Sequence, residues 1–480
     1  MNIKAIFHTL GRLLWVEAIL MMLPLLVSLI YKESTYLSFL LPIAVLAVSG
    51  FLLYLIKPER KNFYAKEGFV LVGMSWILMS LFGCLPFIIS EQIPNFFDAF
   101  FETVSGFTTT GASILSNVEA LSQSMLFWRL FTHWIGGMGV LVFVLAILPS
   151  SEGHNIFILR AESTGPKVGK LVSKVKVTAR ILYLIYIGMT LAEFVFLICG
   201  EMNFFEALVH SFATAGTGGF GIKNDSLMSY SVYSQVVITV FMFIFGINFN
   251  IFYLIIIGKI GQAIKSEELL WYLGIVLVSV AIITANIYSV SASFFVALKD
   301  ACFQVVSIIT TTGFSTVDFN LWPELSKIIL FILMFIGACA GSTGGGLKVS
   351  RIAILFKSVK REIKKIVHPL SVSNINFEGS RVEETVVKGV VNYFVLIIVL
   401  FAAGTFVISI DSFGDFETNI SAMAACLNNI GPGFSKVGPV GNFGGYNPLS
   451  KMVLTFAMLI GRLEIYPMLL LFNPKVWMNK

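Results

Sequence analysis

Ten stretches of the chain are apolar over about the length of a membrane-spanning helix, and this feature limits the possible folds more than any other. A helix that crosses the hydrocarbon core of a bilayer needs about 20 apolar residues. The stretches lie near residues 10–31, 36–56, 67–90, 125–149, 179–200, 232–258, 269–290, 325–340, 386–410 and 450–472. Only 12% of the residues are charged, against about 25% in a soluble domain. The sequence therefore predicts an all-α polytopic membrane protein.

Lysine and arginine gather in alternate loops between these stretches. They follow the second, fourth, sixth and eighth stretches, whereas Lys32 stands alone after the first. Because basic loops stay on the cytoplasmic side, we expect a multi-pass membrane protein with both termini in the cytoplasm. The basic loops either set topology alone, or also bind membrane lipid or a cytoplasmic partner. The net charge of +6 is small for this length, which argues against a nucleic-acid partner.

Four shorter, half-apolar stretches lie between the long ones and resemble one another. They read DAFFETVSGFTTTGAS (98–113), EALVHSFATAGTGGFG (206–221), DACFQVVSIITTTGFS (300–315) and ETNISAMAACLNNIGPGFS (417–435). We align them on one glycine per copy: Gly111, Gly219, Gly313 and Gly431. An acidic residue then stands thirteen residues before the glycine in three copies and fourteen before it in the last. A fixed spacing that recurs four times indicates an internal repeat.

Each copy predicts a re-entrant half-helix followed by a non-helical loop at membrane depth. An acidic residue favours the positive N-terminal end of a helix, and the C-terminal end then presents partial negative charge to a cation. Glycine tolerates positive φ, so the loop carbonyls can turn toward one axis. Four such loops can replace the hydration shell of an ion. The predicted cation-binding filter residues are Thr109, Thr110, Gly111, Thr217, Gly218, Gly219, Thr311, Thr312, Gly313, Asn429, Ile430 and Gly431.

The expected architecture is two leading transmembrane helices followed by four helix–pore loop–helix repeats around one pseudo-four-fold pore. The predicted boundaries are 1–60 for the leading helices and 61–160, 161–260, 261–370 and 371–480 for the repeats. The fourth loop differs most from the others, because Pro432 lacks an N–H and has a fixed φ. The pore is therefore not expected to be four-fold symmetric in detail.

A run of small residues interrupts the eighth apolar stretch. Gly344, Gly345 and Gly346 each disfavour a helix by about 1 kcal/mol relative to alanine. From the residues alone, this segment is either a helix break at the membrane edge or a hinge over the conduction path.

Several polar residues lie within or beside the apolar stretches. Arg462 is in the last one, where a charge needs a cavity or a partner such as Glu464. We expect Glu193 to be a helix–helix hydrogen-bond partner rather than an ion site. Arg129 and His133 are near the start of a stretch, so we expect them at the membrane interface.

As a set, these motifs resemble those of the bacterial Trk-type potassium uptake subunits (TrkH and TrkG), in a superfamily with KtrB and the plant HKT proteins. The likeness covers nearly the whole chain. The motifs on which the resemblance rests are TTTGAS (108–113), WIGGMG (134–139), TGGFG (217–221), TTTGFS (310–315), GSTGGGLK (341–348), NNIGPGF (428–434) and IGR (460–462).

The resemblance implies that the four aligned glycines belong to a potassium filter. In the plant relatives a serine at the first position accompanies sodium transport, so Gly111 favours potassium here. The resemblance also implies a gate under the filter in the third repeat and a buried pore arginine, Arg462. The corresponding gating-loop residues are Gly337, Gly341, Ser342, Thr343, Gly344, Gly345, Gly346 and Lys348.

The family resemblance further implies a homodimer that rests on a cytoplasmic nucleotide-binding regulatory ring of the TrkA type. Any NAD or ATP control would come from that ring, because no nucleotide-binding domain or other cofactor site is expected in this chain. Potassium is then the substrate rather than a cofactor.

The expected function is potassium uptake through a gated, channel-like pore, without enzyme activity. The alternative is a symporter that couples potassium to a proton or to sodium. Few titratable groups lie in the predicted pathway, which argues against a proton relay but not against sodium coupling. A membrane enzyme would need clustered His, Asp or Glu residues at one face. A structural or receptor role leaves the four repeats unexplained.

Overall fold

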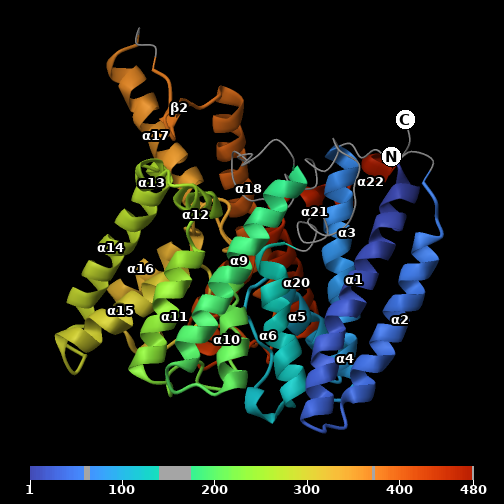
Figure 1. The fold of residues 1–480 in the computed structure, drawn as a ribbon. Helices are drawn as coiled ribbons and strands as arrows, with labels where there is room; N and C mark the ends of the chain where they lie inside the picture. Colours follow the sequence, from blue (N-terminus) through green and yellow to red (C-terminus); the bar gives the residue numbers. More distant parts are fainter. Residues whose placement is uncertain (59–64, 140–174, 370–372, 478–480) are drawn as a thin grey trace.

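A computed structural model describes residues 1–58, 65–139, 175–369 and 373–477. The described chain is mostly helical, with one two-stranded antiparallel hairpin, β1 (Asn376–Phe377) and β2 (Ser380–Arg381). The two termini lie near each other at one face of the molecule (Figure 1). The all-α fold class is thus confirmed. The repeat boundaries stay predictions.

Two leading helices, α1 (Ile3–Ile30) and α2 (Tyr36–Tyr54), pack along each other at one edge of the molecule (Figure 1). Glycines allow this close approach, because a methyl group built on Gly11 would lie 2.6 Å from the Gly50 carbonyl oxygen. Both helices leave large apolar side chains exposed on their outer faces, such as Val48 at 61%. A bilayer would cover such a surface.

The remaining helices include four short ones, of 12 to 16 residues, and each is followed by a second helix. The short helices are α5 (Phe96–Phe107), α10 (Phe204–Ala215), α15 (Phe294–Ile309) and α19 (Phe416–Leu427). Each is followed by α6 (Gln123–Gly137), α11 (Val232–Phe245), α16 (Glu324–Phe335) or α20 (Pro448–Arg462), respectively. Neighbours in this order touch, and α20 touches α5, so the eight helices form a closed circuit.

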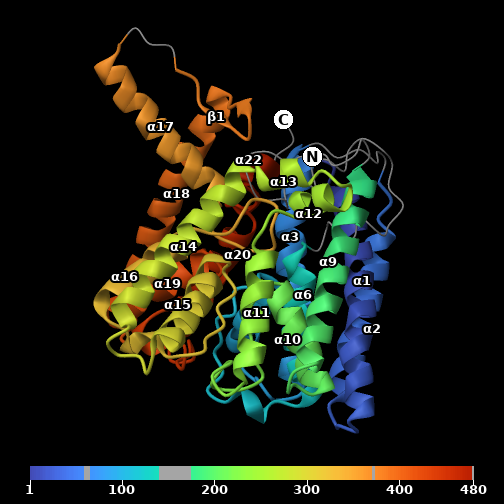
Figure 2. The ribbon, with the colours of Figure 1, turned by 60° about the vertical axis from the view of Figure 1, so that its left-hand side comes forward.

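Other helices lie outside or between these eight. They are α3 (Ala65–Gly83), α4 (Leu85–Ile89), α9 (Val175–Ile198), α12 (Phe249–Ile256), α13 (Ile260–Ile264), α14 (Glu267–Ile287), α17 (Val349–Val367), α18 (Glu384–Ile408), α21 (Tyr466–Leu471) and α22 (Pro474–Trp477). Three 3-10 turns lie in the loops at Val118–Ala120, Phe319–Leu321 and Ser435–Val437. The helix α17 and the β-hairpin project from the same face as the termini (Figure 2).

Fewer helices than expected have the length and composition of a membrane span. Within the described ranges there are six, or seven if α11 and α12, which meet at 91°, count as one span. The expected span near 125–149 is described only as far as residue 139. The stretch near 325–340 stops at Phe335, before the glycine-rich run. The stretch near 450–472 breaks after Arg462, where Glu464 and Ile465 have φ of 59° and 65°.

The basic loops are only partly described. Residues 59–64 and 140–174 lie outside the described residues, and they include most of the lysines and arginines expected after the second and fourth stretches. The basic segment after the eighth stretch is largely α17, whose last turn holds Lys364 and Lys365.

Side-chain caps begin the four short helices. Asn95 accepts from Phe97 N and Asp98 N, and Asn203 forms a capping box with Glu206. Asp415 caps α19, and hydrogen bonds from the Thr418 side chain and backbone lower the pKa of its carboxyl group. An acidic first turn is therefore confirmed in α5, α10 and α19.

The expectation is wrong for the third short helix. Ser293 caps α15, so Asp300 lies well inside the helix, where it pairs with Lys299 at 2.8 Å. Helix-forming residues between the cap and Asp300 lengthen the helix at its N-terminus.

Candidate functional site

The four short helices end in the same way. In each, the last helical turn is closed by an N–H to C=O bond of 2.9 Å between residues five apart, from Thr110 to Ser105 in the first copy. The equivalent bonds run from Gly218 to Ala213, Thr312 to Ser307 and Ile430 to Ala425. In each copy a second bond joins residues three apart, such as Thr109 N to the Gly106 carbonyl oxygen. The two bonds together form a Schellman motif, which places the residue before the first donor in the left-handed region.

That left-handed position is occupied by a side-chain-bearing residue in every copy. Thr109, Thr217, Thr311 and Asn429 have φ of 55°, 52°, 58° and 56°. Two residues later, Gly111, Gly219, Gly313 and Gly431 have φ of 80°, 78°, 85° and 102°. The positive φ expected at the aligned glycines is confirmed. The positive φ at the threonines was not expected, because β-branched residues rarely adopt it.

The four glycines face one another's loops in cyclic order. A methyl group built on Gly111 would lie 2.1 Å from the Gly218 carbonyl oxygen, and one on Gly219 would lie 1.9 Å from that of Thr312. A methyl group built on Gly313 would lie 2.0 Å from the Ile430 carbonyl oxygen, and one on Gly431 would lie 2.7 Å from the Thr110 carbonyl oxygen. Each loop therefore abuts the next, and the fourth abuts the first. The structure thus brings the twelve residues predicted from the sequence into one closed ring.

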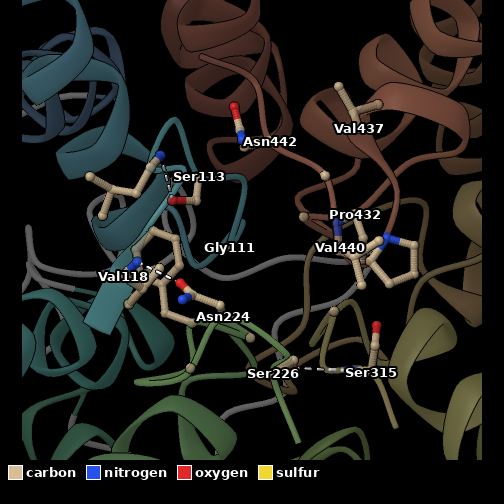
Figure 3. A pocket seen from close by; sticks show the side chains of 18 of the residues that line it. Gly111, Ser113, Val118, Asn224, Ser226, Ser315, Pro432, Val437, Val440 and Asn442 are labelled. Carbon is tan, nitrogen blue, oxygen red and sulfur yellow. Dashed lines mark hydrogen bonds between the residues drawn. The ribbon is translucent and has the colours of Figure 1, made fainter. Parts of the chain in front are cut away.

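A cavity of about 130 Å³ opens at the ring on the side where the loops continue (Figure 3). All four aligned glycines line it, together with residues of the following segments such as Ser113, Asn224 and Pro432. Hydrogen bonds between repeats hold its rim: Val118 N donates to Asn224 Oδ1 at 2.7 Å, and Ser315 N donates to Ser226 Oγ at 3.2 Å. Among the described residues that line it, none is acidic.

The fourth loop joins the first through a side chain. Asn429 Nδ2 donates to Thr110 Oγ1 and to the Met458 carbonyl oxygen, both at 2.9 Å. A threonine could not reach both acceptors, so this departure from the TTTG pattern provides a contact between the first and last repeats.

The glycine-rich segment 336–348 lies on the other side of the ring. Gly345 N donates to Thr311 Oγ1 at 2.7 Å, and a methyl group on Gly344 would lie 2.8 Å from the Thr310 carbonyl oxygen. The segment doubles back on itself, with Gly337 N bonded to the Leu347 carbonyl oxygen at 2.7 Å. The segment therefore contacts the loop of the third repeat (loop 3) where it leaves α15, on the side of the ring opposite the cavity.

Two buried cations hold this segment. Arg462 donates to the Thr343 carbonyl oxygen at 2.7 Å, and to those of Gly136 and Gly137 at 2.5 and 2.8 Å. The Lys348 ammonium group donates to the carbonyl oxygens of Gly344 and Gly345. Glu464, the partner considered for Arg462, forms an ion pair with Arg351 of α17 at 2.6 Å.

The expected interfacial positions of Arg129 and His133 are wrong. Both are buried in α6, at 3% and 0% exposure, directly behind the ring. Arg129 pairs with Glu102 of α5 at 2.6 Å and donates to the Gly221 carbonyl oxygen at 3.0 Å. Glu102 also accepts from Ser113 Oγ and Ile114 N, both at 2.9 Å. Hydropathy alone could not place these residues, because Arg129 binds Glu102, 27 residues away in the chain, and Gly221, 92 residues away.

The acids at the starts of the short helices bind nearby groups. Asp98 pairs with Lys451 of α20, and Glu417 lies 3.9 Å from Lys327 of α16. Glu193 is fully buried in α9 close to Thr214, but neither of its carboxyl oxygens forms a hydrogen bond of good geometry with a described residue. The role expected for Glu193 in joining helices therefore stays a prediction.

Comparisons with known proteins cover the whole length of the chain. The sequence profile of the TrkH family, described as a cation transport protein, matches residues 38–478. The chain is 36% identical to the Trk system potassium uptake protein TrkH of Escherichia coli K12, over 99% of this chain and 100% of the relative. It is 33% identical to TrkG of the same organism, over 99% of each chain.

A solved structure shows the same architecture. The crystal structure of the potassium transporter TrkH from Vibrio parahaemolyticus matches with a TM-score of 0.89 at 33% identity and covers 100% of both chains. Similarity of this extent in both sequence and structure shows that the chain belongs to the TrkH family of cation transport proteins.

Proposed function

We propose that this protein takes up potassium across the inner membrane through a gated, channel-like pore with a carbonyl selectivity filter. The observation that supports this most directly is the closed ring in which each of four loops abuts the next. Relatives that match the whole chain are named potassium uptake proteins. Transport through such a pore needs no enzyme activity and no cofactor, and the ion itself is the substrate.

The ring has the chemistry to bind a dehydrated cation. The proposed filter residues have fully buried side chains at Thr109, Thr110, Thr217, Thr311, Thr312 and Asn429. Backbone that is not helical survives at membrane depth only where protein buries it or it lines a wet path. The four short helices end at the ring, so their partially negative C-termini favour a cation there.

The segment 336–348 is the proposed gate, and its contacts describe a closed state. It lies against loop 3 on the side opposite the cavity, with Arg462 bonded to Thr343 and Lys348 bonded to Gly344 and Gly345. An ion that leaves the ring would meet this segment and two positive charges. Opening then requires the segment to move away from Thr311 and Arg462.

The orientation and the partners are also proposals. Both termini and α17 lie at one face, which we assign to the cytoplasm because the basic residues of α17 are there. A homodimer on a TrkA-type regulatory ring that binds NAD or ATP would contact this face. The membrane potential supplies about 2.3 kcal/mol per charge per 100 mV, which drives inward potassium movement.

The alternative is a symporter that couples potassium to a proton or to sodium. The buried carboxyl groups of Glu17 and Glu193 have no well-formed hydrogen bond to a described residue, and they are the groups that a proton relay could use. Both lie in helices outside the circuit that surrounds the ring, which favours passive conduction. Reversal potentials at varied pH and sodium concentration separate the two mechanisms, because a pure potassium pore responds to neither.

The first test is cation flux into liposomes that contain the purified protein, with wild type compared with Gly111→Ser. We expect potassium and rubidium flux in wild type and increased sodium entry in the variant. The reason is that a side chain at this position must displace the Gly218 carbonyl, 2.1 Å from its first atom. Unchanged sodium entry in a folded Gly111→Ser protein would contradict the four-loop filter.

A closed gate would block flux without disproving the pore. Deletion of Gly344–Gly346 removes the part of the segment that contacts loop 3. We therefore expect this deletion to give potassium flux in the absence of any partner. No potassium flux through either the wild type or the deletion variant would count against conduction.

A further inference from the structure

His133 joins the filter loop of one repeat to the short helix of another. Its Nδ1 lies 2.8 Å from the Gly106 carbonyl oxygen in α5, and its Nε2 accepts from Phe220 N at 3.3 Å. Phe220 directly follows Gly219, whose φ of 78° belongs to the ring. A single buried imidazole thus links the last turn of the first short helix to the second loop.

The two contacts define which nitrogen carries the proton. A carbonyl oxygen can only accept, so Nδ1 must be the donor toward Gly106. A backbone N–H can only donate, so Nε2 of His133 must be unprotonated. The geometry therefore requires the neutral ring with its proton on Nδ1. A second proton would set an N–H on Nε2 against the N–H of Phe220.

Loop 2 packs on this side chain without a gap. A methyl group on Gly218 would lie 2.1 Å from His133 Cγ, and one on Gly216 would lie 2.2 Å from the His133 carbonyl oxygen. Phe220 is held between two groups of α6: its ring centroid is 4.3 Å from that of His133 and 3.4 Å from the guanidinium carbon of Arg129. Movement of His133 must therefore move residues 218–220.

The fourth repeat offers a comparison for this position. Gly136 in α6 and Gly461 in α20 pack in the same way, since methyl groups on them would lie 1.8 Å and 2.0 Å from the last carbonyl oxygens of α5 and α19. Three residues before these glycines stand His133 and Met458. Methionine cannot donate a hydrogen bond. The side-chain link between α6 and loop 2 thus has no counterpart in α20.

We propose that His133 is a positioning residue that determines cation selectivity, because it sets the placement of the loop 2 carbonyls relative to the first repeat. The inference rests on the proposed filter function. It predicts that the Phe220 contact, rather than the volume of the imidazole, controls discrimination between potassium and sodium.

Two substitutions separate the two ends of the link. In His133→Asn the amide nitrogen takes the place of Nδ1 and keeps the bond to Gly106, but the side chain is too short to reach Phe220. In His133→Gln the amide oxygen reaches the place of Nε2 and can still accept from Phe220 N. The control is His8→Asn, because the His8 Nδ1 also lies 2.8 Å from a backbone carbonyl oxygen, that of Tyr54, but His8 is on α1 at the edge of the molecule.

The measurement is the ratio of sodium to potassium flux in liposomes, with the thermal stability of each variant in potassium and in sodium. We expect His133→Asn to raise the sodium-to-potassium ratio about five-fold, the change that loss of one ordinary hydrogen bond allows. His133→Gln should stay within about two-fold of wild type, and His8→Asn should not change the ratio. Stabilisation by potassium reports ion binding even when the gate is closed.

Three results would overturn the inference. A His133→Asn ratio equal to that of wild type would show that the link does not set selectivity. Equal increases in His133→Asn and His133→Gln would show that only the imidazole packing matters. Wild-type protein with neither potassium flux nor stabilisation by potassium over sodium would remove the proposed filter function itself, and this inference with it.

Discussion

Thr109, Thr217 and Thr311 hold left-handed backbone conformations within the Schellman motifs that end three short helices. Each such residue stores about 1–3 kcal/mol of strain. A glycine would fit this position better, so the side chain must contribute something else. For Thr311 the contribution is visible, because its hydroxyl accepts from Gly345 N of the glycine-rich segment. The hydroxyl of Thr109 is buried and has no hydrogen-bond partner among the described residues.

This difference between two equivalent threonines gives a prediction. Thr109→Gly and Thr311→Gly both relieve strain and both remove a whole threonine side chain, but only the second loses a hydrogen bond to the proposed gate. We expect Thr311→Gly to be less stable than Thr109→Gly by about 1 kcal/mol, measured by thermal unfolding in detergent. We also expect more potassium leak from Thr311→Gly liposomes. Equal stability and equal leak would show that the contact with Gly345 does not hold the segment.

Single residues were predicted from the sequence only where a local rule applies. The glycines of the ring were found because positive φ favours glycine and the spacing repeats. The threonines beside them were placed in the filter, but their conformation could not be anticipated, since propensity opposes it. Glu102, Arg129 and His133 were missed as supports of the ring, because Arg129 and His133 bind groups that are 27 to 92 residues away in the chain, Glu102 among them.

At the scale of elements, the broken helix between α16 and α17 is the main departure from a regular repeat. The sequence predicted the break from three consecutive glycines. The residues alone left its position open, because the fold of the segment depends on contacts with α11, α12 and α20, and only the family resemblance implied a place under the filter. Phe249 N bonds the Gly341 carbonyl oxygen, and Cys339 N bonds that of Gly246. Arg462 completes the set from the end of α20.

Removal of the Arg462 guanidinium should release this element. Arg462→Ala loses three hydrogen bonds from a charged donor to the carbonyl oxygens of Thr343, Gly136 and Gly137, and each is worth about 1.5–3 kcal/mol. We expect potassium flux without a partner to rise about ten-fold or more, which corresponds to a closed state weakened by at least about 1.4 kcal/mol. Single-channel recording gives the open probability directly.

The matched control for this experiment is Arg12→Ala. Arg12 lies on α1 at the edge of the molecule, where its guanidinium contacts His8 and Tyr54 rather than the ring. Its loss removes the same charge without touching the segment. Unchanged conductance and open probability in Arg462→Ala would reject the proposed role of Arg462 in the gate.

At the scale of the whole molecule, hydropathy predicted the class of protein but overestimated the number of regular spans. The long outer helices α1, α2, α9, α14 and α18 match their apolar stretches closely. The inner helices that follow the short ones are shorter or bent, because they end where glycines pack against the ring. Gly136 and Gly461 are examples: each leaves no room for a side chain beside the helix end that it touches. The hydrophobic periodicity of one stretch cannot predict such a contact, because the contact depends on another segment of the chain.

The proposed orientation can be tested with a cysteine that the chain already contains. Cys199, at the end of α9, is exposed, whereas Cys84, Cys339 and Cys426 are buried and Cys302 is partly buried. The C-terminal end of α9, which Cys199 directly follows, lies at the face opposite the termini (Figure 1). We expect a membrane-impermeant thiol reagent to label Cys199 in intact cells. Cys199→Ser is the control for background labelling.

The opposite face provides the complementary measurement. Lys360 is exposed on α17, so Lys360→Cys in the Cys199→Ser background should react only after the membrane is opened. Labelling of Lys360→Cys in intact cells would reverse the proposed orientation and place the termini outside.

The ring is built from four unequal loops of one polypeptide, so each wall of the proposed ion site is encoded by its own codons. In an assembly of four identical subunits, one nucleotide change would alter all four walls together. Here it alters one wall and leaves three as they were, as Asn429 in the fourth loop already illustrates. Ion preference in such a protein can therefore change one loop at a time during evolution. A variant with an intermediate preference can persist before the other three loops change.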